Sequence, residues 1–197
     1  MIRIALTGGI ASGKSEVSRI LREQGAFVVD HDILAREAVE VGTAGLAAIE
    51  REFGGQVIRA DGSLDRAALG AIVFGESTKL RALNAIVHPE VKRLADLADE
   101  HALASGKCVV VHDIPLLAET SQAQGFDEVF VVEAPEVERV RRMMENRGMS
   151  EEDARTRIAS QASDAQRRAI ATQVLHNDAG LSELRDSVLR VWHEVVG

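Results

Sequence analysis

A glycine-rich stretch near the N-terminus has the residue types and spacing that could do chemistry. Residues 8–15 read GGIASGKS, which matches G-x-x-x-x-G-K-[ST] between a β-type apolar run at residues 2–7 and a helical pattern at residues 15–24. Glycines let the backbone lie against a polyphosphate, so that its amides and the following helix N-terminus face the anion. The spacing therefore predicts a nucleotide-binding loop formed by Gly8, Gly9, Ile10, Ala11, Ser12, Gly13, Lys14, Ser15 and Glu16.

Two side chains of this loop suit a bound polyphosphate. Lys14 would place a mobile positive charge on the β- and γ-phosphates. Ser15 lies in the first turn of the expected helix, where its hydroxyl oxygen could bind Mg²⁺, a hard ion that usually arrives with the nucleotide. The alternative is a glycine-rich turn with an incidental lysine, and the flanking strand and helix favour nucleotide binding over it.

Acidic residues follow the second expected strand, residues 26–29. If the strand persists to residue 32, its two-residue alternation sends Asp30 and Asp32 to the same side. Ligands of open parallel sheets bind at the carboxyl ends of the strands, so these acids would face the phosphates. Either could accept a proton from an attacking hydroxyl. Asp32 could instead serve only as the N-cap of a helix at residues 33–41.

A second acidic signal follows residues 108–112, the most β-rich run in the sequence. Asp113 ends that run, and an acid at such a place can hold Mg²⁺ directly or through water. Cys108, the only cysteine, begins the run and is expected to be a small buried hydrophobe. A lone cysteine excludes an internal disulfide and fits a reducing compartment.

Eight arginines lie in one segment, residues 139–168, of an otherwise acidic chain. The 23 basic and 31 acidic residues give a net charge of −8, which argues against general nucleic-acid binding. An anionic ligand must therefore meet local positive charge. The segment is either a solvated helical face or a lid that closes over phosphates. Its arginines are Arg139, Arg141, Arg142, Arg147, Arg155, Arg157, Arg167 and Arg168.

Length and composition indicate one α/β domain. The chain has 197 residues, 46% of them apolar, which suffices for one sizeable core with a small insertion or lid. No apolar stretch approaches the roughly 18 residues of a membrane helix, and the N-terminus enters a strand without a signal-peptide pattern. We therefore expect a cytoplasmic protein with no membrane partner, no nucleic-acid partner and no obligate protein partner.

Helical patterns dominate the middle of the chain. We expect helices at residues 44–53, 64–74, 78–87 and 89–105, the last two separated at His88 and Pro89. The place of His88 before a proline favours a site role for this residue. The remaining expected elements are a strand at 127–133, a helix opened by Pro135, a helix at 151–161, a strand at 173–176 and a helix at 181–195.

These stretches resemble the dephospho-CoA kinases, P-loop kinases of coenzyme A biosynthesis, essentially from end to end. The resemblance implies a P-loop NTPase-type α/β fold, in which a five-stranded parallel sheet is flanked by helices and joined by a helical substrate region and a lid. It is carried by residues 6–10 with 14–15, 29–33 with 35–36, 53–54 with 61–62, 83–89 (LNAIVHP), 113–117 (DIPLL) with 119, and by Gln161 and Asn177.

The resemblance also implies a division of one kinase domain, residues 1–197. A nucleotide core would comprise about residues 1–32, 106–134 and 172–197. A helical acceptor-binding region would span about residues 33–105, and a lid about residues 136–168.

The family transfers the γ-phosphoryl group of ATP to the ribose 3′-hydroxyl of dephospho-CoA, giving coenzyme A and ADP. By position, the resemblance implies ATP as co-substrate, Mg²⁺ held by Ser15 and Asp113, and Asp32 as base. Lys14 and Arg142 would be the other catalytic residues, and Asn177 would lie on the adenine side. The implied acceptor-binding residues are Asp30, Asp32, Arg36, His88, Pro115 and Leu116, and the implied lid residues are Arg139, Arg142 and Arg147.

Another small-molecule or nucleoside-monophosphate kinase on the same scaffold is the nearest alternative. A P-loop switch protein and a degenerate kinase kept as a scaffold are more distant ones. The switch protein would lack a phosphorylated small-molecule product, and the degenerate kinase would not turn over ATP.

Four positions depart from the family pattern. Ala11 stands where a loop glycine is usual, and we expect a negative φ there because a Cβ at positive φ costs about 1–2 kcal/mol. Glu16 replaces a hydroxyl and could shift metal or base affinity. Asn146, beside Arg147, replaces a lid arginine, and Thr172 replaces an aspartate before the last strand.

Overall fold

The chain folds into two compact units, which a computed structural model describes for residues 1–197 except the side chain of Ser121. The first unit, Met1–Asp30 with His101–Gly197, contains every strand of the described sheet. The second unit, His31–Glu100, is helical apart from one isolated β-bridge. Among the described residues, no helix has both the length and the apolar content needed to cross a membrane.

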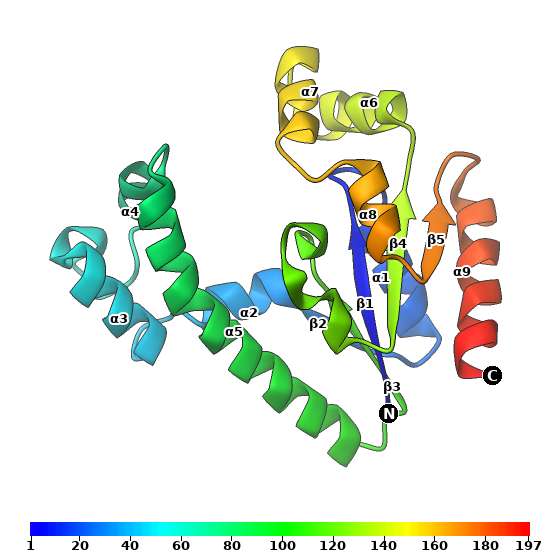
Figure 1. The fold of residues 1–197 in the computed structure, drawn as a ribbon, viewed down its shortest axis with the longest axis horizontal. Coiled ribbons are helices and arrows are strands. Elements are labelled where there is room, and N and C mark those ends of the chain that lie inside the picture. The colour runs from blue at the N-terminus through cyan, green and yellow to red at the C-terminus, as the bar shows by residue number, and fades with distance from the viewer. The chain divides into compact units, whose positions relative to one another are not determined.

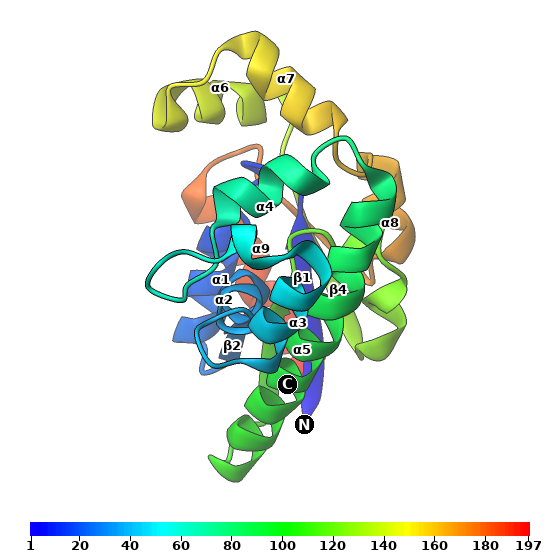
Figure 2. The same cartoon turned by 90° about the vertical axis from the view of Figure 1, so that its left-hand side faces the viewer.

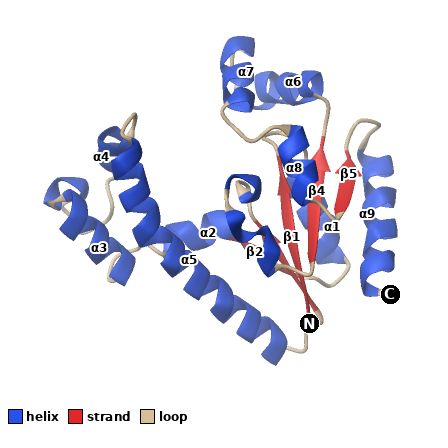
Figure 3. Cartoon of the chain, in the orientation of Figure 1, coloured by secondary structure: helices blue, strands red, loops and turns tan.

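A five-stranded parallel sheet forms the centre of the first unit (Figures 1 and 3). Its strand order is β2-β3-β1-β4-β5, and each neighbouring pair is parallel. This confirms the sheet that the sequence predicts. The strands are β1 (Ile2–Gly8), β2 (Phe27–Asp30), β3 (Val109–Asp113), β4 (Glu128–Glu133) and β5 (Gln173–His176).

Helices cover both faces of this sheet, which explains its almost continuous apolar strands. On one face, α1 (Lys14–Glu23) and α9 (Leu181–Val196) bury side chains such as Ile20 and Trp192 against β1, β3, β4 and β5. On the other face, the core includes Ala5 and Val131 with Leu117 of the short helix η2 (Leu117–Glu119). The same face carries η3 (Ser121–Gly125) and α8 (Asp164–Ile170), which lies in front of the sheet in Figure 1.

Two helices, α6 (Glu136–Arg147) and α7 (Glu151–Ala159), lie beyond the carboxyl ends of the strands, as Figures 1 and 2 show. Ser150 caps α7 by accepting a hydrogen bond from the Asp153 amide at 3.1 Å. The single helix expected at residues 151–161 is wrong at its end, because α7 stops at Ala159. Ser163 then starts α8 with a capping box to Gln166.

The second unit has a core of its own, formed by α3 (Ala44–Phe53), the loop around η1 (Gly55–Val57) and α4 (Arg66–Val73). Leu46, Ile49 and Phe53 are buried there against side chains of α5 (Ser77–Ala104). The expected break at His88 and Pro89 is wrong, because α5 runs through both residues. Apolar contacts made by α5 before and after Pro89 offset the backbone hydrogen bond that the proline removes.

Two local expectations about polar residues also fail. The strand β2 ends at Asp30, and α2 (His31–Glu37) begins at the next residue. Asp32 therefore lies in the first turn of α2, so it neither continues the strand alternation nor occupies the N-cap of a helix at 33–41. Cys108 is exposed rather than buried, because it precedes the buried part of β3.

Ala11 has a φ of 59°, so the negative φ expected from the sequence is wrong. The loop turns through the left-handed region at this residue, which strains any side chain with a Cβ. Its side chain packs with Ile10 against Val140, Met143 and Ala154 of α6 and α7. That apolar contact offsets part of the strain.

Replacing Ala11 by glycine should stabilise the fold by up to about 1 kcal/mol. Glycine relieves the left-handed strain, which is about 1–2 kcal/mol. This gain exceeds the free-energy cost of making the unfolded chain more flexible, which is about 0.4–1 kcal/mol. The free energy of unfolding in urea measures the difference. Ala85→Gly, at an exposed position inside α5, is the matched control and should lose about 1 kcal/mol. Similar losses in both variants would mean that the Ala11 methyl contact outweighs its strain.

Candidate active site

The loop between β1 and α1 is shaped by three glycines whose missing Cβ atoms leave room for other groups. A Cβ on Gly8 would lie 2.6 Å from Ser12 Oγ and 2.7 Å from the Val132 carbonyl oxygen. Gly13 has a φ of 98° and lies directly beneath the side-chain amide of Asn177. Helix α1 starts immediately after Gly13. The unpaired amides of its first turn and the positive end of its dipole therefore lie at the loop. This is the backbone geometry that binds phosphate.

Lys14 and Asp113 form an ion pair beside the loop. Asp113 ends β3, where its Cα is paired in register with that of Leu6 on β1 and that of Asp30 on β2. The strands thus bring the carboxylates of Asp30 and Asp113 to neighbouring positions at the carboxyl edge of the sheet, as expected. Lys14 is held there by the acid that the sequence assigns to the metal.

The oxygen donors fit Mg²⁺ only in company with a nucleotide. Ser15 lies exposed in the first turn of α1, and Asp113 supplies a carboxylate. Within the described residues, no group of three or more His, Cys, Asp or Glu side chains could hold a metal. Mg²⁺ usually completes its octahedron with phosphate oxygens and water, which suits a site with few protein ligands.

Donors from two distant segments satisfy the outward-facing carbonyls of the loop. The buried Asn177, just after β5, donates from Nδ2 to the Ser12 carbonyl at 2.8 Å. Arg142 of α6 donates to the carbonyls of Ala11, Ser12 and Asn177 at 3.2, 3.4 and 3.3 Å. Both residues therefore hold the loop, a role that the sequence pattern does not reveal.

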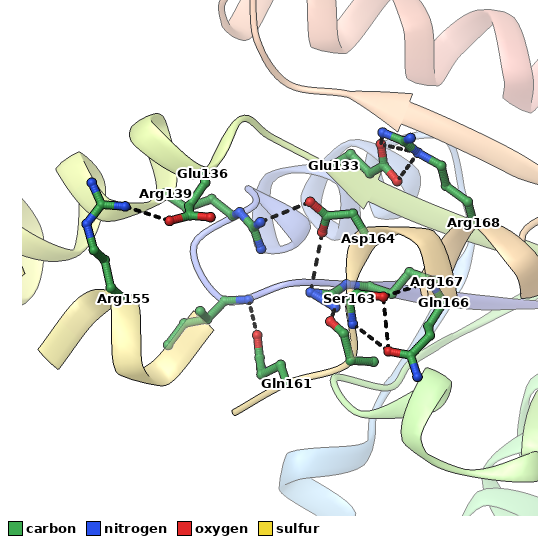
Figure 4. Close-up of polar contacts among 12 residues, drawn as sticks. Glu133, Glu136, Arg139, Arg155, Gln161, Ser163, Asp164, Gln166, Arg167 and Arg168 are labelled. Atoms are coloured by element: carbon green, nitrogen blue, oxygen red, sulfur yellow. Dashed lines mark hydrogen bonds and ion pairs between the residues drawn. The ribbon is translucent and has the colours of Figure 1, made fainter. Parts of the chain in front are cut away.

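Gln161, between α7 and α8, is a further contact of the loop. Its Oε1 accepts a hydrogen bond from the Ile10 amide at 2.8 Å (Figure 4). Together with the apolar packing of Ile10 and Ala11 on α6 and α7, this bond ties the loop to the segment expected to be a lid.

Two buried arginines lie over Gly9, one from α6 and one from α8. The side chains of Arg139 and Arg167 are each only 4% exposed. Both contact Asp164, at 3.1 Å from Arg139 Nη2 and 3.5 Å from Arg167 Nη2, as Figure 4 shows. A Cβ on Gly9 would overlap Arg139 Nη1 and lie 2.7 Å from Arg167 Nη2. Sequence reasoning assigned Arg139 to the lid and missed Arg167 as a site residue.

The other predicted residues differ in their surroundings. Glu16 pairs on α1 with Arg19, whose hydrogen bond lowers the pKa of the Glu16 carboxyl, and its effect on metal or base affinity stays a prediction. Arg147 and Leu116 are exposed, and the Pro115 carbonyl accepts from Thr7 Oγ1 at 3.3 Å. Asp32, Arg36 and His88 are exposed in the second unit, and their roles stay predictions.

Thr172 has a structural contact where the family pattern has an aspartate. Its hydroxyl accepts a hydrogen bond from the Val129 amide at 2.9 Å and contacts the Glu128 carboxylate. Thr172 therefore joins the start of β5 to β4. An aspartate is not needed to fix this end of the strand.

The parallel sheet, the glycine loop with Lys14 and the acid at the end of β3 define a P-loop nucleotide-binding protein of the kinase type. Comparisons with known proteins agree. Residues 2–183 match the family model for dephospho-CoA kinase. The chain belongs to the dephospho-CoA kinase family, whose members use ATP to phosphorylate dephospho-CoA in the last step of coenzyme A biosynthesis.

Individual relatives match over almost the whole chain. A dephospho-CoA kinase of Cutibacterium acnes is 48% identical over 100% of this chain and 86% of its own. One of Thermobifida fusca is 50% identical over 99% of this chain and 96% of its own. A crystal structure from Thermus thermophilus is 37% identical, covers 100% of this chain and 98% of its own, and superposes with a TM-score of 0.86.

Replacing Asn177 by alanine should loosen the loop. The buried Ser12 carbonyl would keep only the longer contact from Arg142, and an unsatisfied buried group costs about 1–3 kcal/mol. We expect lower stability in urea and an ATP dissociation constant raised about tenfold, since the loop must be reordered on binding. Asn146→Ala, at an exposed position of α6, is the control. Unchanged ATP binding in Asn177→Ala would remove this residue from the nucleotide site.

Proposed function

We propose that the chain transfers the γ-phosphoryl group of ATP to the ribose 3′-hydroxyl of dephospho-CoA, with Mg²⁺ as metal. The observation that carries this proposal is the phosphate loop, held by Asn177, Arg142 and Gln161 beside the Lys14–Asp113 pair. Membership of the dephospho-CoA kinase family supports the acceptor. It does not favour the alternative, a nucleoside-monophosphate kinase on this scaffold.

Binding and orientation of the phosphates would fall to the loop. Its amides and the N-terminus of α1 hold the phosphate oxygens, and Lys14 moves its charge from Asp113 toward the β- and γ-phosphates. The oxygens of Ser15 and Asp113 would hold Mg²⁺, which supplies charge neutralisation on the phosphates when bound. Most of the rate then comes from positioning and electrostatic stabilisation rather than from covalent chemistry.

Proton transfer and acceptor binding would fall to residues that the family pattern assigns by position. Asp32, in the first turn of α2, accepts the proton of the attacking hydroxyl. Asp30, Arg36, His88, Pro115 and Leu116 contact the acceptor. Arg142 keeps the loop in its binding shape, and Arg147 approaches the phosphates when residues 136–168 close as a lid.

The reaction takes place in the cytoplasm and needs no obligate protein partner. The only cysteine, Cys108, is an exposed free thiol, which is compatible with a reducing compartment. The substrates are small molecules, and the chain's net charge of −8 gives no support for nucleic acid as a partner.

ATP consumption with Mg²⁺ and dephospho-CoA should exceed that with AMP, CMP, UMP or no acceptor. The product should carry its new phosphate on the ribose 3′-oxygen, which mass spectrometry and NMR can locate. Removing Mg²⁺ with EDTA should abolish turnover, because the protein alone neutralises too little phosphate charge. Turnover confined to a nucleoside monophosphate would contradict the proposed acceptor and leave the nucleotide site intact.

Replacing Asp32 by asparagine should lower kcat by about 10²–10⁴-fold, the usual contribution of a general base. The ATP dissociation constant, measured by calorimetry, should stay within about twofold, because the base touches the acceptor rather than the nucleotide. Glu37→Gln, another exposed acid of α2, is the matched control and should keep wild-type turnover. Asp30→Asn tests the neighbouring acid. A large loss there with little loss in Asp32→Asn would move the base to Asp30.

A further inference from the structure

The two arginines over Gly9 have hydrogen-bond donors that the protein does not use. Within the described part of the chain, Arg139 Nε, Arg139 Nη1 and Arg167 Nε are buried without a partner. Arg167 Nη1 donates to the Ala162 carbonyl, and one Nη2 from each arginine contacts Asp164. Buried donors are almost always satisfied in folded proteins. Three unused donors in one place therefore point to a ligand acceptor.

The charges at this place are also unbalanced. Two buried guanidinium groups share one carboxylate, that of Asp164, whose side chain is 39% exposed. Burial lowers the pKa of Arg167, and Arg139 lowers it further, whereas Asp164, Glu119 and Glu133 oppose both effects. Glu119 is engaged by the Ala162 amide, which donates to its Oε1 at 2.8 Å. The nearby Glu133 is already engaged by Arg168 at 2.7–2.9 Å. A buried positive charge without a full partner is costly, so the pair is suited to a bound anion.

The position of the pair identifies which anion it suits. Gly9 lies at the strand end of the phosphate loop, whereas Asn177 and Arg142 bind the loop at Ala11, Ser12 and Gly13, next to the start of α1. Amides near the helix hold the α- and β-phosphates of a P-loop nucleotide, and the loop lysine reaches the β- and γ-phosphates. The strand end therefore faces the distal phosphate.

We infer that Arg139 and Arg167 together form the binding site for the terminal phosphoryl group of the nucleotide, and that this pair makes the site distinguish a triphosphate from a diphosphate. Arg167 is thus a catalytic residue of the proposed reaction. Asp164 holds both guanidinium groups in place with its two carboxylate oxygens. The inference rests on the proposed phosphoryl transfer and names the residues that hold the moving group.

During transfer, the acceptor oxygen forms a bond to the γ-phosphorus while the bond from that phosphorus to the bridging oxygen breaks. ADP leaves with the electron pair of the broken bond, and the base takes the proton of the acceptor hydroxyl. Charge is then spread over the three outer oxygens of the phosphoryl group. The free donors, which are Nε of both arginines and Nη1 of Arg139, stay with those oxygens and exchange no proton, since arginine keeps its charge.

Calorimetry with Mg²⁺ and either the non-hydrolysable analogue AMP-PNP or ADP, without acceptor, tests the inference. Arg167→Gln and Arg139→Gln should each raise the dissociation constant of AMP-PNP about 10–100-fold, the value of a lost charged hydrogen bond. The dissociation constant of ADP should change less than about twofold. Equal losses for both nucleotides, or no loss for AMP-PNP, would overturn the inference.

Two further variants separate a ligand contact from a structural role. Arg141→Gln on α6 removes an exposed arginine paired with Glu138 and Glu145 and should leave both dissociation constants unchanged. Arg167→Lys keeps a buried charge and protects the fold, but it lacks the planar donors of arginine. It should melt close to wild type and still lose affinity for AMP-PNP more than for ADP. A wild-type preference for AMP-PNP in this variant would also overturn the inference.

The binding experiment is independent of the acceptor. Failure of the proposed function would appear as turnover of another acceptor, with the preference for AMP-PNP still lost in Arg167→Gln. Failure of the inference would appear as normal nucleotide discrimination in Arg167→Gln, whatever the acceptor.

Discussion

The loop after β1 must present its amides to an anion, so its carbonyls have to be satisfied from outside. Asn177 Nδ2 and the guanidinium of Arg142 provide these hydrogen bonds to Ser12 and Ala11. The need for these hydrogen bonds explains why the turn after β5 and the helix α6 meet at this loop. A loop whose carbonyls were left buried and unpaired would pay about 1–3 kcal/mol for each, too much for a marginally stable fold.

Positive charge is concentrated where the chain needs it, against an overall charge of −8. Lys14 is paired with Asp113, whereas Arg139 and Arg167 share Asp164. These pairs lower the cost of burying cations before a ligand arrives. Arg139 and Arg167 keep unused hydrogen-bond donors, and the side chain of Lys14 can move. Phosphate can therefore be bound by groups that are already in place.

The segment that includes α6, α7 and α8 contributes more than a covering layer. Its small apolar core, Val140, Met143 and Ala154, packs on Ile10 and Ala11, and Gln161 accepts from the Ile10 amide. The methyl group of Ala11 takes part in this packing although its φ of 59° is strained. The loop is therefore joined to the arginine-bearing helices by apolar packing and a hydrogen bond, so that a displacement of one requires these contacts to adjust.

The sequence alone determined the nucleotide loop, the acid at the end of β3, the five parallel strands and the family. These features depend on local spacing and apolar periodicity, which a sequence displays directly. It misplaced the break at Pro89 and the φ of Ala11, because contacts from distant residues override local preference. It also misjudged the exposure of Cys108, which precedes the buried part of β3. Only the tertiary structure decided that Asn177 and Arg142 hold the loop and that Arg139 and Arg167 lie together over Gly9. Those contacts join residues far apart in the chain, and eight arginines in one segment look alike until folding buries two of them.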